Sequence, residues 1–447
     1  MKKTGVALLL LGGLVASSPA WLGFGLWRLP DAVDVAVSMG AKLGCSGHFI
    51  SGFEDQRILS DLASYSPANS LLTLTYTANT ATADLLGISQ ASATYRPGLG
   101  CTLDIGNTHG LEGLQGKPTD LANNNAAIPV SIRPAWQASL DSLLAQDNQQ
   151  GLDTRALLVV KDGQIIAESY GPGVSDSTPL LGWSMGKSVT AILLGRMQTL
   201  GAVKINQNAL FSDWQNDARA GIRLENMLQM TSGLGFDETY APGTDATKML
   251  FGAHAAAQLP LLSSAAYKAG SYFDYSSGTT NLLMRYMRDQ LGSEQALLDM
   301  LYQQLAAPLG LTTLVIEPDP SGVLVGSSYI YASGRDWAGL GNLMLAEGVW
   351  QGKTLLSADW VQRTQQPNRS DNDRRYGYQF WLNAADREDK SSWRWPQLPA
   401  DAYAMLGNRK QVVMIIPSLD MVFVRLGWSK QEYPTEQNIL QLLTTES

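Results

Sequence analysis

Apolar residues follow a helical spacing over several long stretches of the chain. Between Trp183 and Leu200, the side chains that repeat every three to four residues are Val189, Ile192, Leu193, Met197 and Leu200. This spacing predicts a buried helix that begins near Trp183. Similar spacing predicts further helices over residues 134–146, 281–291, 335–347 and 436–443.

Two pairs of β-forming segments predict β-hairpins. Residues 155–160 and 164–169 flank a Lys-Asp-Gly turn, and residues 411–416 and 421–426 flank a turn that begins at Pro417. The chain order is therefore helix, two strands, a long helical insertion, more strands and a terminal helix. This order predicts an α+β fold in which helices cover an antiparallel sheet, with an α-rich lobe between the two halves of the sheet.

A smaller unit precedes this fold. Residues 29–105 indicate a small α+β module, because residues 70–77 and 92–95 are rich in β-forming types. Residues 106–130 are rich in Gly, Asn, Thr and Pro, which is typical of a linker. The predicted division is a module at 29–105, a linker at 106–130 and the main domain at 131–447.

Residues 1–28 predict export from the cytoplasm. Two lysines precede an apolar run, and small residues end at Ala20, as in a secretory signal. The apolar character continues, so that the span from Gly5 to Trp27 is long enough to cross a bilayer. Cleavage after Ala20 and an uncleaved anchor both fit, and the anchor is favoured. We expect a periplasmic body tethered to the inner membrane by this segment.

Composition argues against several classes of function. A net charge of −8 and a pI near 5.0 give no basic surface for nucleic acid. With only 3 histidines, a histidine-based zinc site is not expected, and neither is any other metal or cofactor. The two cysteines, Cys45 and Cys101, predict one disulfide within the small module of an exported chain. Two unpaired buried thiols are the alternative.

The start of the helix near Trp183 carries a possible catalytic pair, Ser184 and Lys187. Three residues apart on a helix, they share one face. A serine hydroxyl needs a neighbouring base, and a lysine can serve if burial and the helix dipole disfavour its ammonium form. Alone, the pair would more often be an N-capping serine and a solvated lysine. The Gly-x-Ser-x-Gly pattern around Ser184 also fits the nucleophile elbow of α/β-hydrolases, which needs a histidine late in the chain. The only histidine after Ser184 is His254, which lies in an apolar context with nearly 200 residues still to follow, so this interpretation is weak.

Further motifs follow in order: LQMTSGL at residues 228–234, Tyr275-Ser276-Ser277, GYQFW at 377–381, Asn408-Arg409-Lys410, and IPSLD at 416–420. With these motifs, residues 130 to 447 resemble the serine hydrolases of the β-lactamase and penicillin-binding-protein superfamily. The nearest branch is similar to class C β-lactamases and includes 6-aminohexanoate-oligomer hydrolases and esterases. The resemblance implies a β-lactamase/transpeptidase-like fold.

The resemblance also implies roles for individual residues. Ser184 would be acylated with Lys187 as its base, and Tyr275 would relay the proton to the leaving group. Ser277 would donate a hydrogen bond to Lys187 or to substrate. The oxyanion hole would be formed by the backbone N–H groups of Ser184 and Gln411. Asp237 and Glu238, which follow the LQMTSGL motif, carry no assigned role.

The third motif departs from the family pattern. Relatives carry Lys or His, one residue and then Gly, whereas this chain has Asn408, Arg409 and Lys410. Asn408 can donate a hydrogen bond but has no charge. Arg409 or Lys410 could supply a charge, although alternation along a strand would point only one of them into the cleft.

The expected function is hydrolysis of a small ester or amide. A penicillin-interactive D-alanyl-D-alanine carboxypeptidase or β-lactamase is the first alternative, and the altered third motif weakens it. A binding protein on a decayed hydrolase scaffold is the second, and the intact Ser184, Lys187 and Tyr275 argue against it.

Overall fold

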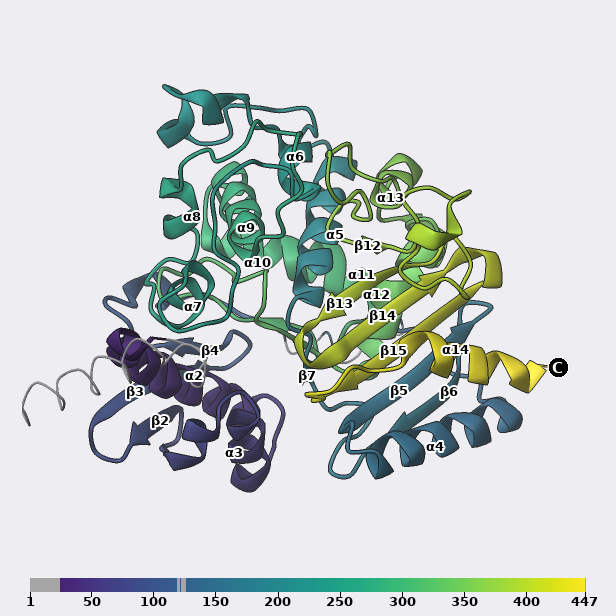
Figure 1. Ribbon diagram of the computed structural model, residues 1–447, viewed down its shortest axis with the longest axis horizontal. Helices are drawn as coiled ribbons and strands as arrows, with labels where there is room; N and C mark the ends of the chain where they lie inside the picture. The colour runs from purple at the N-terminus through teal and green to yellow at the C-terminus, as the bar shows by residue number, and fades with distance from the viewer. Residues whose placement is uncertain (1–24, 119–120, 122–125, 447) are drawn as a thin grey trace, which may run out of the picture.

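The computed structural model describes residues 25–118, 121 and 126–446, and it contains a six-stranded antiparallel sheet (Figure 1). The strand order is β12-β13-β14-β15-β5-β6, so strands from the two ends of the main domain meet where β15 pairs with β5. The bounds are β5 Thr154–Lys161, β6 Gln164–Tyr170, β12 Trp381–Leu382, β13 Tyr403–Gly407, β14 Gln411–Ile416 and β15 Met421–Gly427.

Helices cover both faces of this sheet. On one face, α4 (Pro134–Gln149) and α14 (Thr435–Leu443) share a hydrophobic cluster with alternate strand residues such as Met414 and Phe423. On the other, α5 (Met185–Thr199) and α12 (Gly334–Leu345) share one with Val413 and Val424. A strand that is covered on both faces needs apolar residues at successive positions, as in β14. The two predicted hairpins and the α+β fold class are confirmed.

An α-rich lobe lies between β6 and β12 in the chain. Its long helix α9 begins at Ser277 rather than at Asn281 as the spacing predicts, because the Ser276 hydroxyl accepts a hydrogen bond from the Thr279 N–H (3.1 Å) and caps the helix. The remaining bounds are β7 Leu180–Leu181, α6 Leu224–Leu228, α7 Asp245–Phe251, α8 Gln258–Leu262, α9 Ser277–Leu291, α10 Glu294–Leu301, α11 Ala307–Leu309, β8 Val315–Ile316, β9 Ile330–Ala332, β10 Val349–Trp350, β11 Lys353–Thr354 and α13 Ala358–Thr364.

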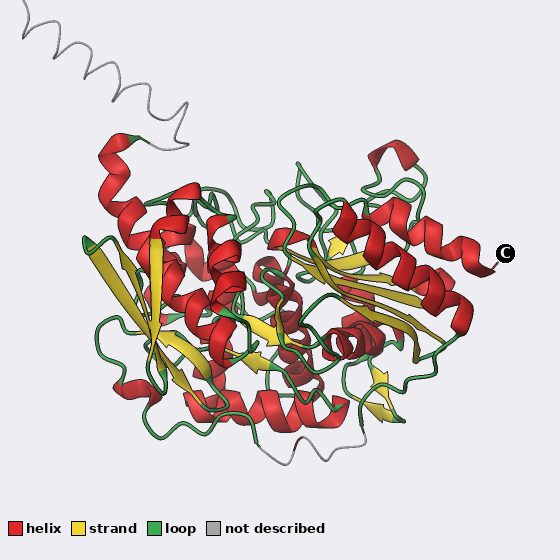
Figure 2. Ribbon diagram, turned by 90° about the horizontal axis from the view of Figure 1, so that it is seen from below, coloured by secondary structure: helices red, strands yellow, loops and turns green. Residues whose placement is uncertain are grey.

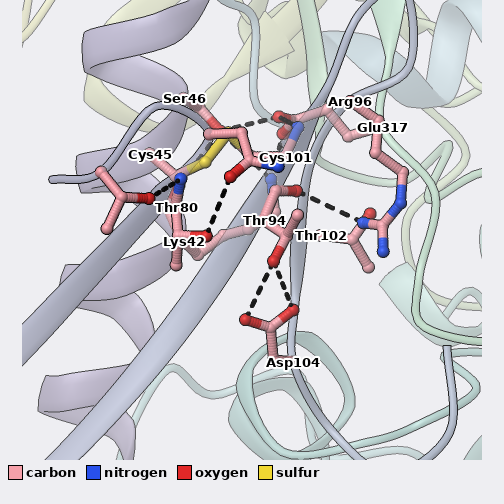
Figure 3. Close-up of a disulfide and its surroundings, with 12 residues drawn as sticks. Lys42, Cys45, Ser46, Thr80, Thr94, Arg96, Cys101, Thr102, Asp104 and Glu317 are labelled. Carbon is pink, nitrogen blue, oxygen red and sulfur yellow. Dashed lines mark hydrogen bonds and ion pairs between the residues drawn. A yellow bond between two sulfur atoms is a disulfide. The ribbon is translucent and has the colours of Figure 1, made fainter.

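The small module is α+β, as expected. Two helices, α2 (Leu29–Phe49) and α3 (Asp55–Ala63), pack with a four-stranded antiparallel sheet. Its strands are β1 Leu72–Tyr76, β2 Thr80–Leu85, β3 Ser89–Arg96 and β4 Gly100–Leu103. A disulfide joins Cys45 in α2 to Cys101 in β4 (Figure 3), so the predicted pairing is confirmed. It links the helix to the last strand of the module.

This module packs against the main domain beside the candidate site. Figure 2 shows the four-stranded and six-stranded sheets at opposite ends of the molecule with helices between them. Val37 and Leu62 of the module lie in the same hydrophobic cluster as Leu181 and Trp183, which come just before Ser184. The division into segments at residues 105 and 130 stays a prediction. The module and the main domain share a buried hydrophobic cluster and are packed together.

A buried ion pair also joins the module to the main domain. Lys42 in α2 pairs with Glu317, which follows β8, and both side chains are at most 2% exposed. Glu317 also accepts hydrogen bonds from the Cys101 N–H (2.7 Å) and from the Ser46 hydroxyl (2.7 Å), as Figure 3 shows. Burial lowers the pKa of Lys42 and raises the pKa of Glu317, while their mutual attraction opposes both shifts.

Among the described residues, no helix is long and apolar enough to cross a membrane. The span predicted from Gly5 to Trp27 lies outside the described residues, apart from its last three positions.

Candidate active site

Ser184 stands at the turn from β7 into α5. Trp183 adopts a left-handed conformation (φ 49°), and α5 begins at Met185, so Ser184 occupies the N-cap position without a capping hydrogen bond from its side chain. A side chain on Gly182 would lie 2.2 Å from the ring of Trp337, so this turn needs glycine there. The tight turn fixes the Ser184 hydroxyl beside the start of the helix, where the helix dipole favours negative charge.

Lys187 lies one turn further along α5, and its ammonium group is held in place from three sides. Nζ is 3.1 Å from Ser184 Oγ, 2.9 Å from Ser277 Oγ and 3.2 Å from the Ser327 carbonyl oxygen. The residue is 1% exposed and forms no ion pair with any described residue. Burial lowers the pKa of Lys187 to about 8, although the negative charge of Glu238 opposes the shift. With this pKa, roughly a tenth of the lysine is neutral at pH 7 and about half at pH 8, and the neutral form can act as a base.

Tyr275 reaches the same point from the loop before α9. Its ring centroid is 4.8 Å from Lys187 Nζ, and it stacks on Trp381 at 5.2 Å. Burial raises the pKa of Tyr275, the charge of Glu238 raises it further, and a hydrogen bond with Ser184 lowers it. The phenol is thus protonated beside Ser184 and able to pass a proton on.

Ser277, at the start of α9, places a second hydroxyl beside Lys187, 2.9 Å from Nζ. Its backbone N–H donates to Glu238 Oε2 (2.7 Å), and its hydroxyl donates to Glu238 Oε1 (2.5 Å). The Tyr240 hydroxyl also donates to Glu238 Oε1 (3.0 Å). No role for Glu238 could be predicted from the sequence, because nothing in its local pattern shows that the loop after α6 folds back onto α9.

Asn408, Arg409 and Lys410 lie in a tight turn between β13 and β14, and not along a strand. Arg409 (φ 61°) and Lys410 (φ 65°) both adopt left-handed conformations. The argument that strand alternation points one of them into a cleft is therefore wrong. Arg409 stacks on Tyr65 of the small module (3.8 Å), and Lys410 pairs with Glu432.

Gly407, at the end of β13, packs directly against the nucleophile turn. A side chain there would lie 2.1 Å from the Gly182 carbonyl oxygen. Gln411 lies opposite Gly407 in the hairpin, and its side-chain amide exchanges two hydrogen bonds with the backbone of Gly427 (2.5 and 2.9 Å). The side chain of Gln411 is therefore committed to the sheet, while that of Asn408 is exposed.

Comparison with known proteins agrees with this arrangement. The family model for Beta-lactamase matches residues 140–444. The chain belongs to the Beta-lactamase family. Membership supports a serine hydrolase activity in general terms and names no substrate. No curated protein matches the sequence.

Solved structures share the fold at low sequence identity. A protein from Bacillus anthracis assigned as a 6-aminohexanoate-dimer hydrolase has a TM-score of 0.55 at 17% identity, covering 72% of this chain and 86% of its own. A penicillin-binding-protein homologue from Caulobacter crescentus has a TM-score of 0.55 at 16% identity, covering 71% of this chain and 98% of its own. A family VIII carboxylesterase has a TM-score of 0.55 at 12% identity, with the same two coverages. The predicted resemblance and fold are confirmed.

No group of His, Cys, Asp and Glu within the described residues is arranged to hold a metal ion.

Proposed function

We propose that the protein hydrolyses a small ester or amide through an acyl-enzyme on Ser184. The observation that carries this proposal is the 3.1 Å contact between Ser184 Oγ and a buried Lys187 whose pKa is lowered to about 8. A buried amine that is partly neutral, beside a hydroxyl at a helix N-terminus, has the properties of a base paired with its nucleophile.

In the first half of the reaction, Ser184 Oγ attacks the substrate carbonyl carbon and its proton moves to Lys187. The carbonyl oxygen becomes an oxyanion. As the bond to the leaving group breaks, a proton passes from Lys187 through the Tyr275 hydroxyl to the leaving alkoxide or amine. In the second half, water attacks the acyl carbon and gives its proton to the same pair. The pair returns this proton to Ser184 Oγ as the acyl C–O bond breaks and the acid leaves.

Backbone N–H groups would stabilise the oxyanion. One donor is the N–H of Ser184 at the start of α5. For the second donor, the N–H of Gln411 remains a prediction. The support is positional. Gly407 packs against Gly182, next to the nucleophile turn, and Gln411 is paired with Gly407 across the β13–β14 hairpin. Asn408 is proposed to donate a side-chain hydrogen bond to substrate, since its side chain is exposed and makes no hydrogen bond to the described residues of this turn.

The substrate is proposed to be an ester or amide that needs no carboxylate recognition. Lys410 pairs with Glu432, and Arg409 stacks on Tyr65. These contacts occupy the two cations of the third motif, so they favour a neutral substrate over a β-lactam or a D-Ala-D-Ala peptide, both of which carry a carboxylate. The similar structure described as a family VIII carboxylesterase is in keeping with this class.

We place the protein outside the cytoplasm, with residues 1–28 as the membrane tether. The support is the sequence of that segment together with the disulfide between Cys45 and Cys101, a bond typical of oxidising compartments.

The pH dependence of ester hydrolysis tests this proposal. Lys187 acts as a base only when neutral, so kcat/KM for p-nitrophenyl acetate should rise with pH and level off above about pH 8. Below the pKa it should fall about tenfold per pH unit. The Ser184→Ala variant should show no catalysis at any pH. A pH profile of kcat/KM whose acid limb has its midpoint near pH 6.5, the ordinary pKa of histidine, would contradict a lysine base.

A further inference from the structure

Glu238 accepts hydrogen bonds from three donors at the edge of the proposed site. It comes from the loop between α6 and α7 and reaches the start of α9. Oε2 accepts from the Ser277 N–H (2.7 Å), and Oε1 accepts from the hydroxyls of Ser277 (2.5 Å) and Tyr240 (3.0 Å). The carboxylate thus binds both the backbone and the side chain of Ser277.

This arrangement fixes the direction of the next hydrogen bond. A serine hydroxyl has one hydrogen, and that of Ser277 points to Glu238. Ser277 Oγ therefore faces Lys187 with a lone pair and must accept from it, at 2.9 Å. The Ser327 carbonyl oxygen, at 3.2 Å, can only accept as well.

Two acceptors use both N–H bonds of a neutral lysine. A neutral amine has two hydrogens and one lone pair, and the remaining neighbour of Lys187 Nζ is Ser184 Oγ at 3.1 Å. The lone pair is then directed at the hydroxyl that must lose its proton. If Ser277 donated to Lys187 instead, it would compete with Ser184 for that lone pair.

We propose that Glu238 is a positioning residue that makes Ser277 a hydrogen-bond acceptor and so directs the base lone pair of Lys187 at Ser184. This inference rests on the proposed function of the Ser184 and Lys187 pair. Glu238 does not touch the reacting atoms and acts through Ser277.

The charge of Glu238 adds a second, separable effect. It opposes the lowering of the Lys187 pKa by burial. The other titratable groups facing this cluster are Tyr240, Asp274, Tyr275 and Tyr376; burial and the charge of Glu238 raise the pKa of all four. The three phenols stay protonated over the range in which Lys187 titrates. Removal of the Glu238 charge should therefore move the Lys187 limb to lower pH.

The test is the rate at which a fluorophosphonate labels the full-length protein, followed by intact mass over a range of pH. Glu238→Gln keeps the shape but replaces one of two accepting oxygens with an NH₂ group. If the NH₂ group faces the Ser277 N–H, two donors meet. If it faces Ser277 Oγ, it donates to that oxygen and reverses the hydrogen bond that Glu238 accepts. We expect labelling on the alkaline plateau to fall by about 10- to 100-fold, with the acid limb shifted to lower pH.

The matched control is Asp237→Asn in the same loop. Asp237 accepts a hydrogen bond from the Thr239 N–H, which asparagine can also do, whereas the carboxylate hydrogen-bonded to Ser277 is that of Glu238. This variant should label within about twofold of the natural protein, with an unchanged limb. A plateau labelling rate for Glu238→Gln within about twofold of the natural protein would overturn the inference, whether or not the acid limb moves.

A double-mutant cycle with Ser277→Ala provides the second test. Without the Ser277 hydroxyl there is no hydrogen-bond direction for Glu238 to fix, so adding Glu238→Gln should change the plateau rate little. If the rate losses of the two single variants multiply in the double variant, Glu238 acts independently of Ser277, and the inference is overturned. Failure of the proposed function looks different, since the natural protein itself would then remain unlabelled.

Discussion

Replacement of Lys187 with methionine should lower kcat/KM for a p-nitrophenyl ester by at least about a thousandfold, within the range of contributions from general bases. Methionine keeps an unbranched apolar chain in the buried site and removes only the amine. The 3.1 Å contact with Ser184 is then lost, and no other described side chain near Ser184 is a neutral base at assay pH. Steady-state kinetics at the alkaline plateau measure the loss.

Lys204→Met is the control for this prediction, since Lys204 is exposed beyond the end of α5. We expect it to retain activity within about twofold of the natural protein. Both variants should have a folded circular dichroism spectrum. Retention of more than about a tenth of the activity by Lys187→Met would show that the amine is not the base, because general bases contribute more than that.

Disruption of the buried ion pair should have the largest effect on stability. Lys42→Met leaves the Glu317 carboxylate buried without its cation, and removal of one partner of such a pair costs about 3–5 kcal/mol. We expect urea unfolding at neutral pH to report a loss of this size. The loss should appear in both the small module and the main domain, because the pair joins them.

The double variant Lys42→Met with Glu317→Gln is the informative control. The glutamine oxygen can still accept from the Cys101 N–H and the Ser46 hydroxyl, while no charge remains buried. It should recover most of the stability, to within about 1–2 kcal/mol of the natural protein. Equal losses in the single and double variants would show that packing of the Lys42 side chain, and not an unpaired charge, sets the cost.

The sequence predicts local features of the fold well. The hairpins β5–β6 and β14–β15 and the helix α5 follow from short-range periodicity and turn residues, which act within about ten residues of the chain. Ser184 and Lys187 could be paired because they are three positions apart on one helix. The contact of Tyr275 with this pair needed the resemblance to a family, since no local pattern brings residue 275 near residue 187.

The features that were not predicted depend on long-range contacts or on unusual backbone conformations. Lys42 and Glu317 are 275 positions apart, and Glu238 meets Ser277 only after the loop folds back. The turn at Arg409 and Lys410 has left-handed conformations that commonly indicate glycine, so two charged residues there gave no turn signal.

The most direct test of the central claim is the covalent adduct on Ser184. Full-length protein is treated with a fluorophosphonate and examined by intact mass and peptide mapping, beside Ser184→Ala and a control at the exposed Ser175, Ser175→Ala. The proposed mechanism predicts one adduct on the Ser184 peptide, present in the natural protein and in Ser175→Ala and absent from Ser184→Ala. No adduct on folded natural protein, or an adduct that persists in Ser184→Ala, would contradict an acyl-enzyme at this residue.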